Sequence, residues 1–201
     1  VKEYIKEKYN KPGDVFLGVV HRLDRPVTGV VLFARTSKAL SRMNKMFQDK
    51  EVKKTYWAVV QNLPDEDEAT LRHFILKDSI KNKSYAFPKM RPGAKEAILT
   101  YRHISSAAKY HLLEVDLQTG RHHQIRCQLA KIGSPIRGDL KYGFSRSNTN
   151  GGISLHARRI SFLHPVKQEP VEIVAPVPKD DNLWREFANV TQTDLKKKKK
   201  Q

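Results

Sequence analysis

His-Arg-Leu-Asp-Arg-Pro-Val-Thr-Gly, residues 21–29, lies between two apolar runs of the chain. Residues 15–20 precede it and residues 30–33 follow it. Short apolar runs bounded by turn residues are typical of buried strands, and the Pro and Gly of this stretch favour a turn. The sequence therefore predicts a loop between two buried strands, which places the carboxylate of Asp24 at a strand end.

Asp24 has two interpretations from this stretch alone. Arg22 and Arg25 flank it, and nearby cations favour the ionised carboxylate. On a loop held by a rigid scaffold, such a carboxylate can act as a nucleophile toward an anionic substrate. In the alternative, both arginines are surface charges and Asp24 is a turn residue that accepts backbone hydrogen bonds.

Helix and strand patterns alternate along the rest of the chain. Apolar spacing predicts helices at residues 1–9, 36–49, 121–132 and 180–190. Strands are predicted at residues 30–34, 51–61, 69–76, 84–86, 95–104, 109–118, 153–163 and 171–175. This mixture predicts an α+β fold, with a mixed, mainly antiparallel β-sheet and flanking helices. We expect residues 1–190 to form one domain and residues 191–201 to be a disordered, lysine-rich tail.

The chain is strongly basic, with a formal net charge of +17 and a pI near 10.0. Lys196–Lys200 supplies five of these charges, which leaves +12 for the other residues. Because phosphate contacts dominate the binding of basic proteins to polyanions, nucleic acid is the first candidate partner.

Cys127 is the only cysteine, so the chain can form neither an internal disulfide nor a thiolate metal cluster. The sequence also shows no signal peptide and no apolar run long enough to span a bilayer. These features predict a cytoplasmic protein with no membrane partner.

Four blocks of the chain, in order, resemble the RluA-type RNA pseudouridine synthases. The stretch at residues 21–29 resembles the signature loop of that family, which usually ends in Thr-Ser-Gly where this chain has Val-Thr-Gly. Residues 52–60 resemble the Lys-x-Tyr-x-Ala strand, and residues 119–126 resemble the segment Thr-Gly-Arg-x-His-Gln-Ile-Arg. The third block continues to Gly143, and Leu155-His156-Ala157 forms the fourth. The resemblance covers roughly residues 15–176.

The resemblance implies the pseudouridine synthase fold with a central active-site cleft, and an isomerase that converts specific uridines of RNA to pseudouridine. It implies that Asp24 is the catalytic group, that Tyr56 stacks on the target base, and that Arg121 pairs with Asp24. A bidentate guanidinium would fix the orientation of that carboxylate. Taken alone, Tyr56 can equally be a core aromatic residue of a strand, and Arg121 can be a phosphate contact.

The resemblance implies that the partner is structured RNA, either ribosomal or transfer RNA. It implies no DNA partner. Arg22 resembles the residue that, in some family members, enters the RNA helix in place of the target base. The expected RNA-binding residues are Arg22, His21, Arg25, Lys54 and Arg126. A structural role is the alternative for His21, since the chemistry needs no histidine.

No cofactor and no metal are expected. His122 and His123 have no cysteine or carboxylate at ligand spacing beside them, so we predict that they bind no metal. Nothing in the sequence demands more than a monomer. The family normally carries a strand well before the Asp loop, and we expect this N-terminal strand to be missing here.

Three classes of function can be compared by the residues that each one requires. An RNA-modifying enzyme needs Asp24, Tyr56 and Arg121, and the chain has all three. A non-catalytic RNA-binding protein on the same fold would be expected to have lost one of them. A glycoside hydrolase normally uses a pair of carboxylates, whereas the matched signature residues supply one.

Overall fold

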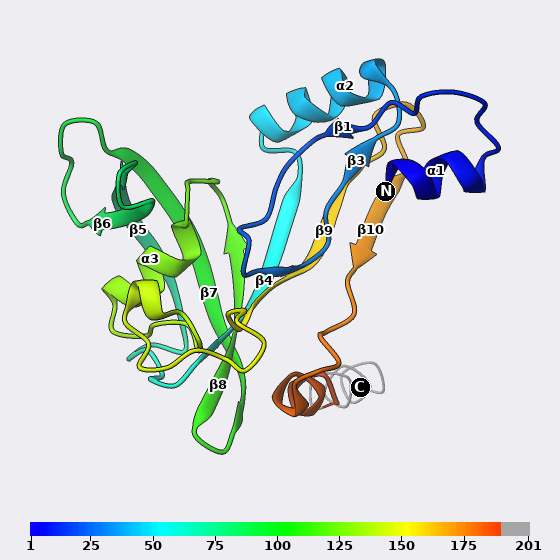
Figure 1. Ribbon diagram of the computed structural model, residues 1–201. Coiled ribbons are helices and arrows are strands. Elements are labelled where there is room, and N and C mark those ends of the chain that lie inside the picture. Colours follow the sequence, from blue (N-terminus) through cyan, green and yellow to red (C-terminus); the bar gives the residue numbers. More distant parts are fainter. Residues whose placement is uncertain (190–201) are drawn as a thin grey trace, which may run out of the picture.

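An eight-stranded, mainly antiparallel sheet forms the centre of the computed structural model, which describes residues 1–189 (Figure 1). Its main path runs β10-β9-β4-β8-β7-β5-β6, and β2 pairs in parallel with β9. A second, two-stranded sheet joins β1 to β3. This arrangement confirms the predicted α+β class.

The helices and strands have the following bounds. The helices are α1 (Lys2–Lys8), α2 (Ser37–Gln48), α3 (Gln124–Lys131), a 3-10 turn at Leu140–Tyr142 and a helix over residues 182–189. The first strands are β1 (Gly18–Val19), β2 (Thr28–Gly29), β3 (Phe33–Ala34), β4 (Lys53–Val60) and β5 (Glu68–Asp78). The others are β6 (Lys83–Phe87), β7 (Lys95–Ala107), β8 (Tyr110–Leu117), β9 (Leu155–Leu163) and β10 (Pro170–Val174).

Both faces of the central strands are covered, which explains why β4 ends in an unbroken apolar run. On one face, Ala58 and Val60 pack with residues of α3 such as Leu129. On the other face, Trp57 and Val59 pack with Trp184 and Phe187 of the helix over residues 182–189. Helix α2 begins as predicted, because Thr36 caps it by accepting a hydrogen bond from the backbone of Ala39.

The Asp24 loop is fixed to the sheet through β2 and β9. Thr28 pairs with His156 and Gly29 pairs with Ala157, and the next strand places Tyr56 opposite Ala157. The Thr28 hydroxyl also lies 2.8 Å from Nδ1 of His156. This row of paired residues brings the loop of the first motif beside Tyr56 of the second.

Two expectations about local structure are wrong. The runs that flank the Asp24 loop are not two buried strands, since only two residues of each are paired and most of their side chains are half-buried or exposed. They pair with each other in a separate two-stranded sheet, in which Val19 and Phe33 are exposed. Helix α3 begins at Gln124 rather than Arg121, because His123 is left-handed (φ 52°) and Gln124 Oε1 accepts bonds from Thr119 and Arg121 that hold a turn.

In the part of the chain that the structure describes, no helix has the length and apolar character needed to cross a membrane. The predicted tail at residues 191–201 lies outside the described residues. Helix α1 confirms the predicted N-terminal helix.

Replacing Gly29 by Ala should destabilise the protein by at least about 2 kcal/mol, because the backbone has a φ of 123° and a Cβ would meet the Ala157 carbonyl oxygen at 2.3 Å. Urea unfolding measures this free energy. Gly13→Ala is the matched control, since a Cβ there has nothing within 4 Å, and it should change stability by less than about 0.5 kcal/mol. Equal stability of the two variants would contradict this account of the loop.

Candidate active site

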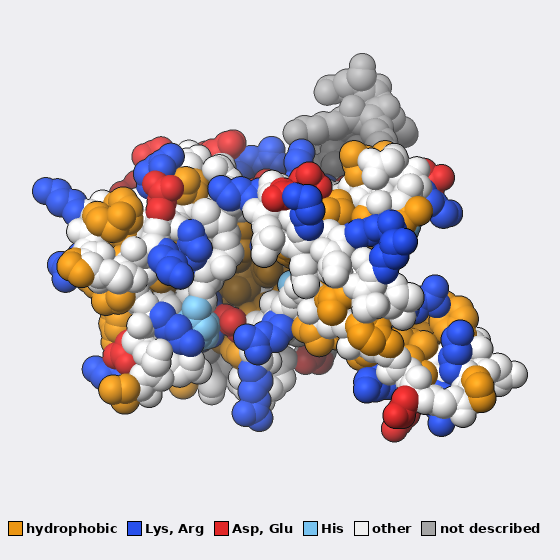
Figure 2. Space-filling view, turned by 90° about the horizontal axis from the view of Figure 1, so that it is seen from above, with side chains coloured by type: hydrophobic (Ala, Val, Ile, Leu, Met, Phe, Trp, Pro, Cys, Tyr) orange, Lys and Arg blue, Asp and Glu red, His pale blue; other side chains and the backbone are white. Residues whose placement is uncertain are grey.

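A cavity of about 750 Å³ opens beside the Asp24 loop. Figure 2 shows it from above as a hollow with apolar side chains at its bottom and charged and histidine side chains around it. Among the residues that the structure describes, Asp24 is the only acidic one in the lining, whereas the basic ones are Arg22, Arg25, Lys54, Arg121, Arg126 and Lys141. The cavity therefore suits an anionic ligand and presents one carboxylate to it.

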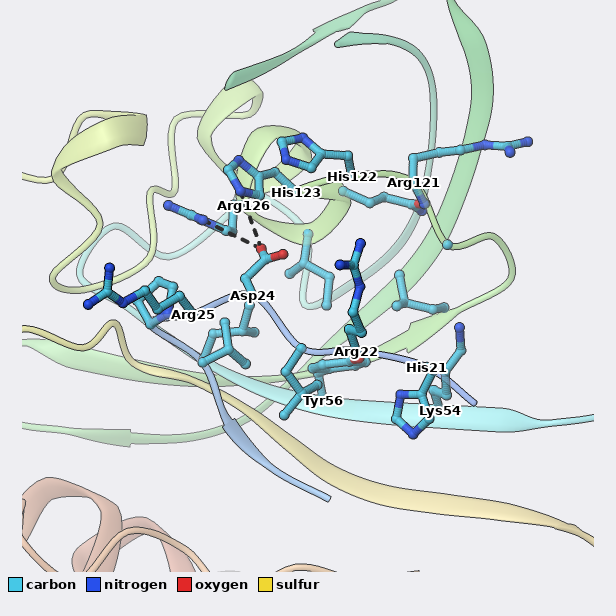
Figure 3. Close-up of a pocket in the computed structure, with 18 of the residues that line it drawn as sticks. His21, Arg22, Asp24, Arg25, Lys54, Tyr56, Arg121, His122, His123 and Arg126 are labelled. Atoms are coloured by element: carbon cyan, nitrogen blue, oxygen red, sulfur yellow. Dashed lines mark hydrogen bonds and ion pairs between the residues drawn. The ribbon is translucent and has the colours of Figure 1, made fainter. Parts of the chain in front are cut away.

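One oxygen of Asp24 is held and the other is open. Oδ2 lies 3.4 Å from Nη1 of Arg126 and 3.7 Å from Nε2 of His123 (Figure 3). Oδ1 has no hydrogen-bond partner among the described residues. The side chain of Asp24 is 30% exposed, so this free oxygen is accessible from the cavity.

Arg126 is fixed by a second carboxylate behind it. Its Nε donates to Oδ2 of Asp139 at 2.7 Å and its Nη2 donates to Oδ1 at 2.8 Å. The side chain of Arg126 is 6% exposed and that of Asp139 is 1% exposed. Burial alone would lower the pKa of Arg126, but the hydrogen bonds and the charge of Asp139 raise it, so the guanidinium stays charged. This geometry leaves Nη1 to face Asp24.

The expectation that Arg121 pairs with Asp24 is wrong. Arg121 is exposed, its Nε donates to the Glu96 carbonyl oxygen at 2.9 Å, and its side chain extends away from Asp24 (Figure 3). Because α3 begins three residues later than expected, Arg126 in its first turn takes that place. Arg121 still lines the cavity, so its alternative role, a contact with a phosphate, stays a prediction.

His123 is a neutral ring whose Nε2 faces Oδ2 of Asp24 at 3.7 Å, which is too far for a direct hydrogen bond. The backbone N–H of Ser84 donates to the hydroxyl oxygen of Tyr142 at 2.8 Å. That hydroxyl lies 2.9 Å from Nδ1 of His123, and because it already accepts from Ser84 we expect it to donate its own proton to this nitrogen. The remaining proton is then on Nε2, which faces Asp24. Burial and the charge of Arg126 lower the pKa of His123 to about 3, in agreement with the neutral ring.

Tyr56 lies on β4 below Asp24, and its ring lines the cavity (Figure 3). Burial, together with the charge of Asp24, raises the pKa of its hydroxyl to about 12. The hydroxyl is therefore protonated at neutral pH, and the ring presents a flat apolar face to a ligand.

The predicted RNA-binding residues line the same cavity, but they differ in role. Arg22 and Arg25 are exposed, and the guanidinium of Arg22 extends into the cavity (Figure 3). Lys54 is half-buried, and burial lowers its pKa. His21 accepts a hydrogen bond from the Leu32 backbone at 3.0 Å across the loop and stacks on a ring of α2, which favours its structural alternative.

Sequence reasoning gave no role to Asp139, His123 or Tyr142, although all three lie in the third matched block. The sequence gives only a weak signal for Asp139, because its neighbours Arg137 and Lys141 are nearer candidates for a cationic partner. The sequence alone does not indicate which cation, because Arg126 is 13 residues away.

Comparison with known proteins decides the family. The family model described as RNA pseudouridylate synthase matches residues 2–131. The chain belongs to this family. Its RluA-type character is confirmed by relatives such as ribosomal large subunit pseudouridine synthase D of Xylella fastidiosa, which is 36% identical over 180 residues (81% of this chain and 52% of the relative).

Other members of the RNA pseudouridylate synthase family match at similar levels. An uncharacterized RNA pseudouridine synthase of Synechocystis is 32% identical over 80% of this chain and 50% of its own length. The tRNA pseudouridine synthase C of Vibrio cholerae is 32% identical over 83% of this chain and 73% of its own. The chain thus spans about half the length of several relatives it matches.

The fold agrees with a solved human structure, RNA Pseudouridylate Synthase Domain Containing 4. It superimposes with a TM-score of 0.75 and 22% identity, covering 95% of this chain and 81% of that one. This likeness confirms the predicted pseudouridine synthase fold.

Tyr142→Phe should raise the pKa of His123 by at least about one unit from its value of about 3, because the ring remains while the proton donated to Nδ1 is lost. Long-range ¹H–¹⁵N NMR across pH 3–8 reports both the tautomer and the pKa. His103, which contacts Ser106 on the far hairpin, should be unchanged. A neutral His123 of the parent protein that carries its proton on Nδ1 would contradict the assigned tautomer.

Proposed function

We propose that this chain is an RNA pseudouridine synthase that isomerises uridine in ribosomal or transfer RNA, with Asp24 as its nucleophile. The observation that carries the proposal is the asymmetry of Asp24: Oδ2 accepts a hydrogen bond from Arg126, and Oδ1 is free toward the cavity. A nucleophilic carboxylate needs this arrangement, in which one oxygen is fixed and the other can reach the substrate.

Pseudouridine formation breaks the bond between N1 of uracil and C1′ of ribose, turns the base and joins C5 to C1′. The free oxygen of Asp24 can attack C1′, attack C6 of the base or accept a ribose proton, and each route needs the ionised carboxylate. Arg126 supplies one positive charge beside Asp24, and the neutral ring of His123 adds no second one. No step requires a cofactor.

Tyr56 supports the step in which the base turns. A protonated tyrosine beside the nucleophile offers a flat apolar surface on which uracil can stack while its glycosidic bond is broken. Its hydroxyl can also help to move the C5 proton once the base has been rejoined. The target base of a stem must leave the helix to reach this cavity, and the exposed Arg22 can occupy the vacated space.

A glycoside hydrolase is disfavoured by the same geometry. That reaction normally needs two carboxylates across the bond, but Asp24 is the only acidic residue lining the cavity. The other nearby carboxylate, Asp139, is buried and has both oxygens bound to Arg126. The alternative is a non-catalytic RNA-binding protein, and an activity measurement distinguishes it from an enzyme.

The parent chain should release tritium from total cellular RNA labelled at C5 of uridine, because C5 loses its proton when it bonds to ribose. Asp24→Asn should lower the rate by at least about a hundredfold. Asp14→Asn, at an exposed position outside the cavity lining, should release tritium at the parent rate. RNA binding without release by the parent would favour the non-catalytic alternative, and equal release by the parent and Asp24→Asn would contradict the role of Asp24.

A further inference from the structure

Strands β4 and β8 separate beside the active-site cavity. Their pairing ends at Thr55 and Asp116, which share a hydrogen bond of 2.6 Å. Beyond this pair, β4 continues back to α2, whereas the chain leaving β8 turns toward β7 and α3 (Figure 1). The backbone amides of Gln118 and Thr119 donate to the Ile98 carbonyl oxygen of β7, which keeps this segment away from β4. We call this opening the fork.

A second cavity of about 920 Å³ lies at the fork and joins the first. Both cavities are lined by Phe47, Lys54, Leu117, Gly120 and Arg121. Lys54 stands inside the fork, and a Cβ on Gly120 would lie 3.4 Å from its Nζ. The absence of a side chain at Gly120 therefore leaves room beside this ammonium group.

The second cavity is basic. Its lining contains Lys50, Lys53, Lys54, Arg121 and Arg159, against two acidic residues, Asp116 and Glu172. Asp116 is engaged by Thr55, and Glu172 lies 4.0 Å from Arg159. Three cations in excess along one groove favour a chain of phosphates over a neutral or cationic ligand.

We propose that the fork and the second cavity bind the single-stranded RNA that flanks the target uridine, with Lys54 and Arg121 at the entrance and Lys53 and Arg159 along the groove. This inference rests on the proposed function, because it places the target uridine in the first cavity. The opening begins where β4 and β8 are still paired, and neighbouring strands of a sheet lie only about 4.8 Å apart, so we expect it to admit one RNA strand more readily than a much wider duplex. The groove thus selects a loop or an unpaired flank.

Anisotropy of a fluorescein-labelled oligonucleotide of 12 uridines tests the groove. All proteins carry Asp24→Asn, so that no turnover occurs. The double variant Lys53→Ala/Arg159→Ala should bind roughly tenfold more weakly in 50 mM salt, and its salt slope should fall by about 1.4, or about 0.7 for each lost phosphate contact. The control Lys109→Ala/Lys167→Ala removes two exposed cations from other turns and should change neither quantity.

The variant Glu172→Gln should change the affinity for the oligonucleotide in the opposite direction. It frees Arg159 from its acidic neighbour, so affinity for the oligonucleotide should rise by about twofold. Misfolding would lower affinity, so this variant separates a local electrostatic effect from a structural one.

Binding of a duplex is measured with the same oligonucleotide of 12 uridines annealed to an oligonucleotide of 12 adenosines. Groove variants should weaken binding of the duplex less than that of the single strand. Equal losses for both, or a double variant that matches the control in affinity and slope, would overturn the proposal. Binding is measured without turnover, so the two proposals can fail separately. If the groove variants bind like the control while the parent releases tritium, only the groove proposal is contradicted. If the groove variants bind more weakly but the parent releases no tritium, only the proposed function is contradicted.

Discussion

A buried, bidentate ion pair between Arg126 and Asp139 is the constraint on which the site depends. Both hydrogen bonds are short, and the two side chains are almost completely excluded from solvent. Breaking such a pair from one side leaves an uncompensated buried charge, which typically costs about 3–5 kcal/mol. The guanidinium therefore has one fixed position, and its remaining nitrogen is directed at Asp24. The position of Asp24 therefore depends on the buried ion pair behind it.

Separate parts of the sheet bring the groups of this site together. The parallel pairing of Thr28 and Gly29 with β9 anchors the Asp24 loop, and the other edge of β9 pairs with β4, which carries Tyr56. Helix α3 supplies Arg126, while Tyr142 of the 3-10 turn and Ser84 of β6 determine the tautomer of His123. The result is a carboxylate that pairs with one buried cation and faces a neutral ring at 3.7 Å, in a cavity whose other charges among the described residues are positive. Such a field favours an anionic ligand and leaves one oxygen of Asp24 available.

The sequence predicts the parts of this fold whose causes are local. Thr36 caps α2 as expected, the alternating strand β8 is found, and the first motif places Asp24 on a loop. The assignment of Arg121 failed because a helix pattern does not reveal that His123 is left-handed and delays the helix by three residues. Asp139 and Tyr142 were missed for a related reason: their roles depend on contacts with Arg126, His123 and Ser84, which are set by tertiary packing. Local patterns carry no information about such pairs.

The most direct test of this account is the kinetics of tritium release by Asp139→Asn, a residue that does not line the cavity. If the pair positions Asp24, kcat should fall by at least about tenfold while KM changes by less than about twofold. The matched control is Asp181→Asn, which disrupts the half-buried pair of Arg137 and Asp181 away from the cavity and should keep the parent kcat. A folded Asp139→Asn protein with the parent kcat would contradict the claim that Arg126 and Asp139 hold the nucleophile in place.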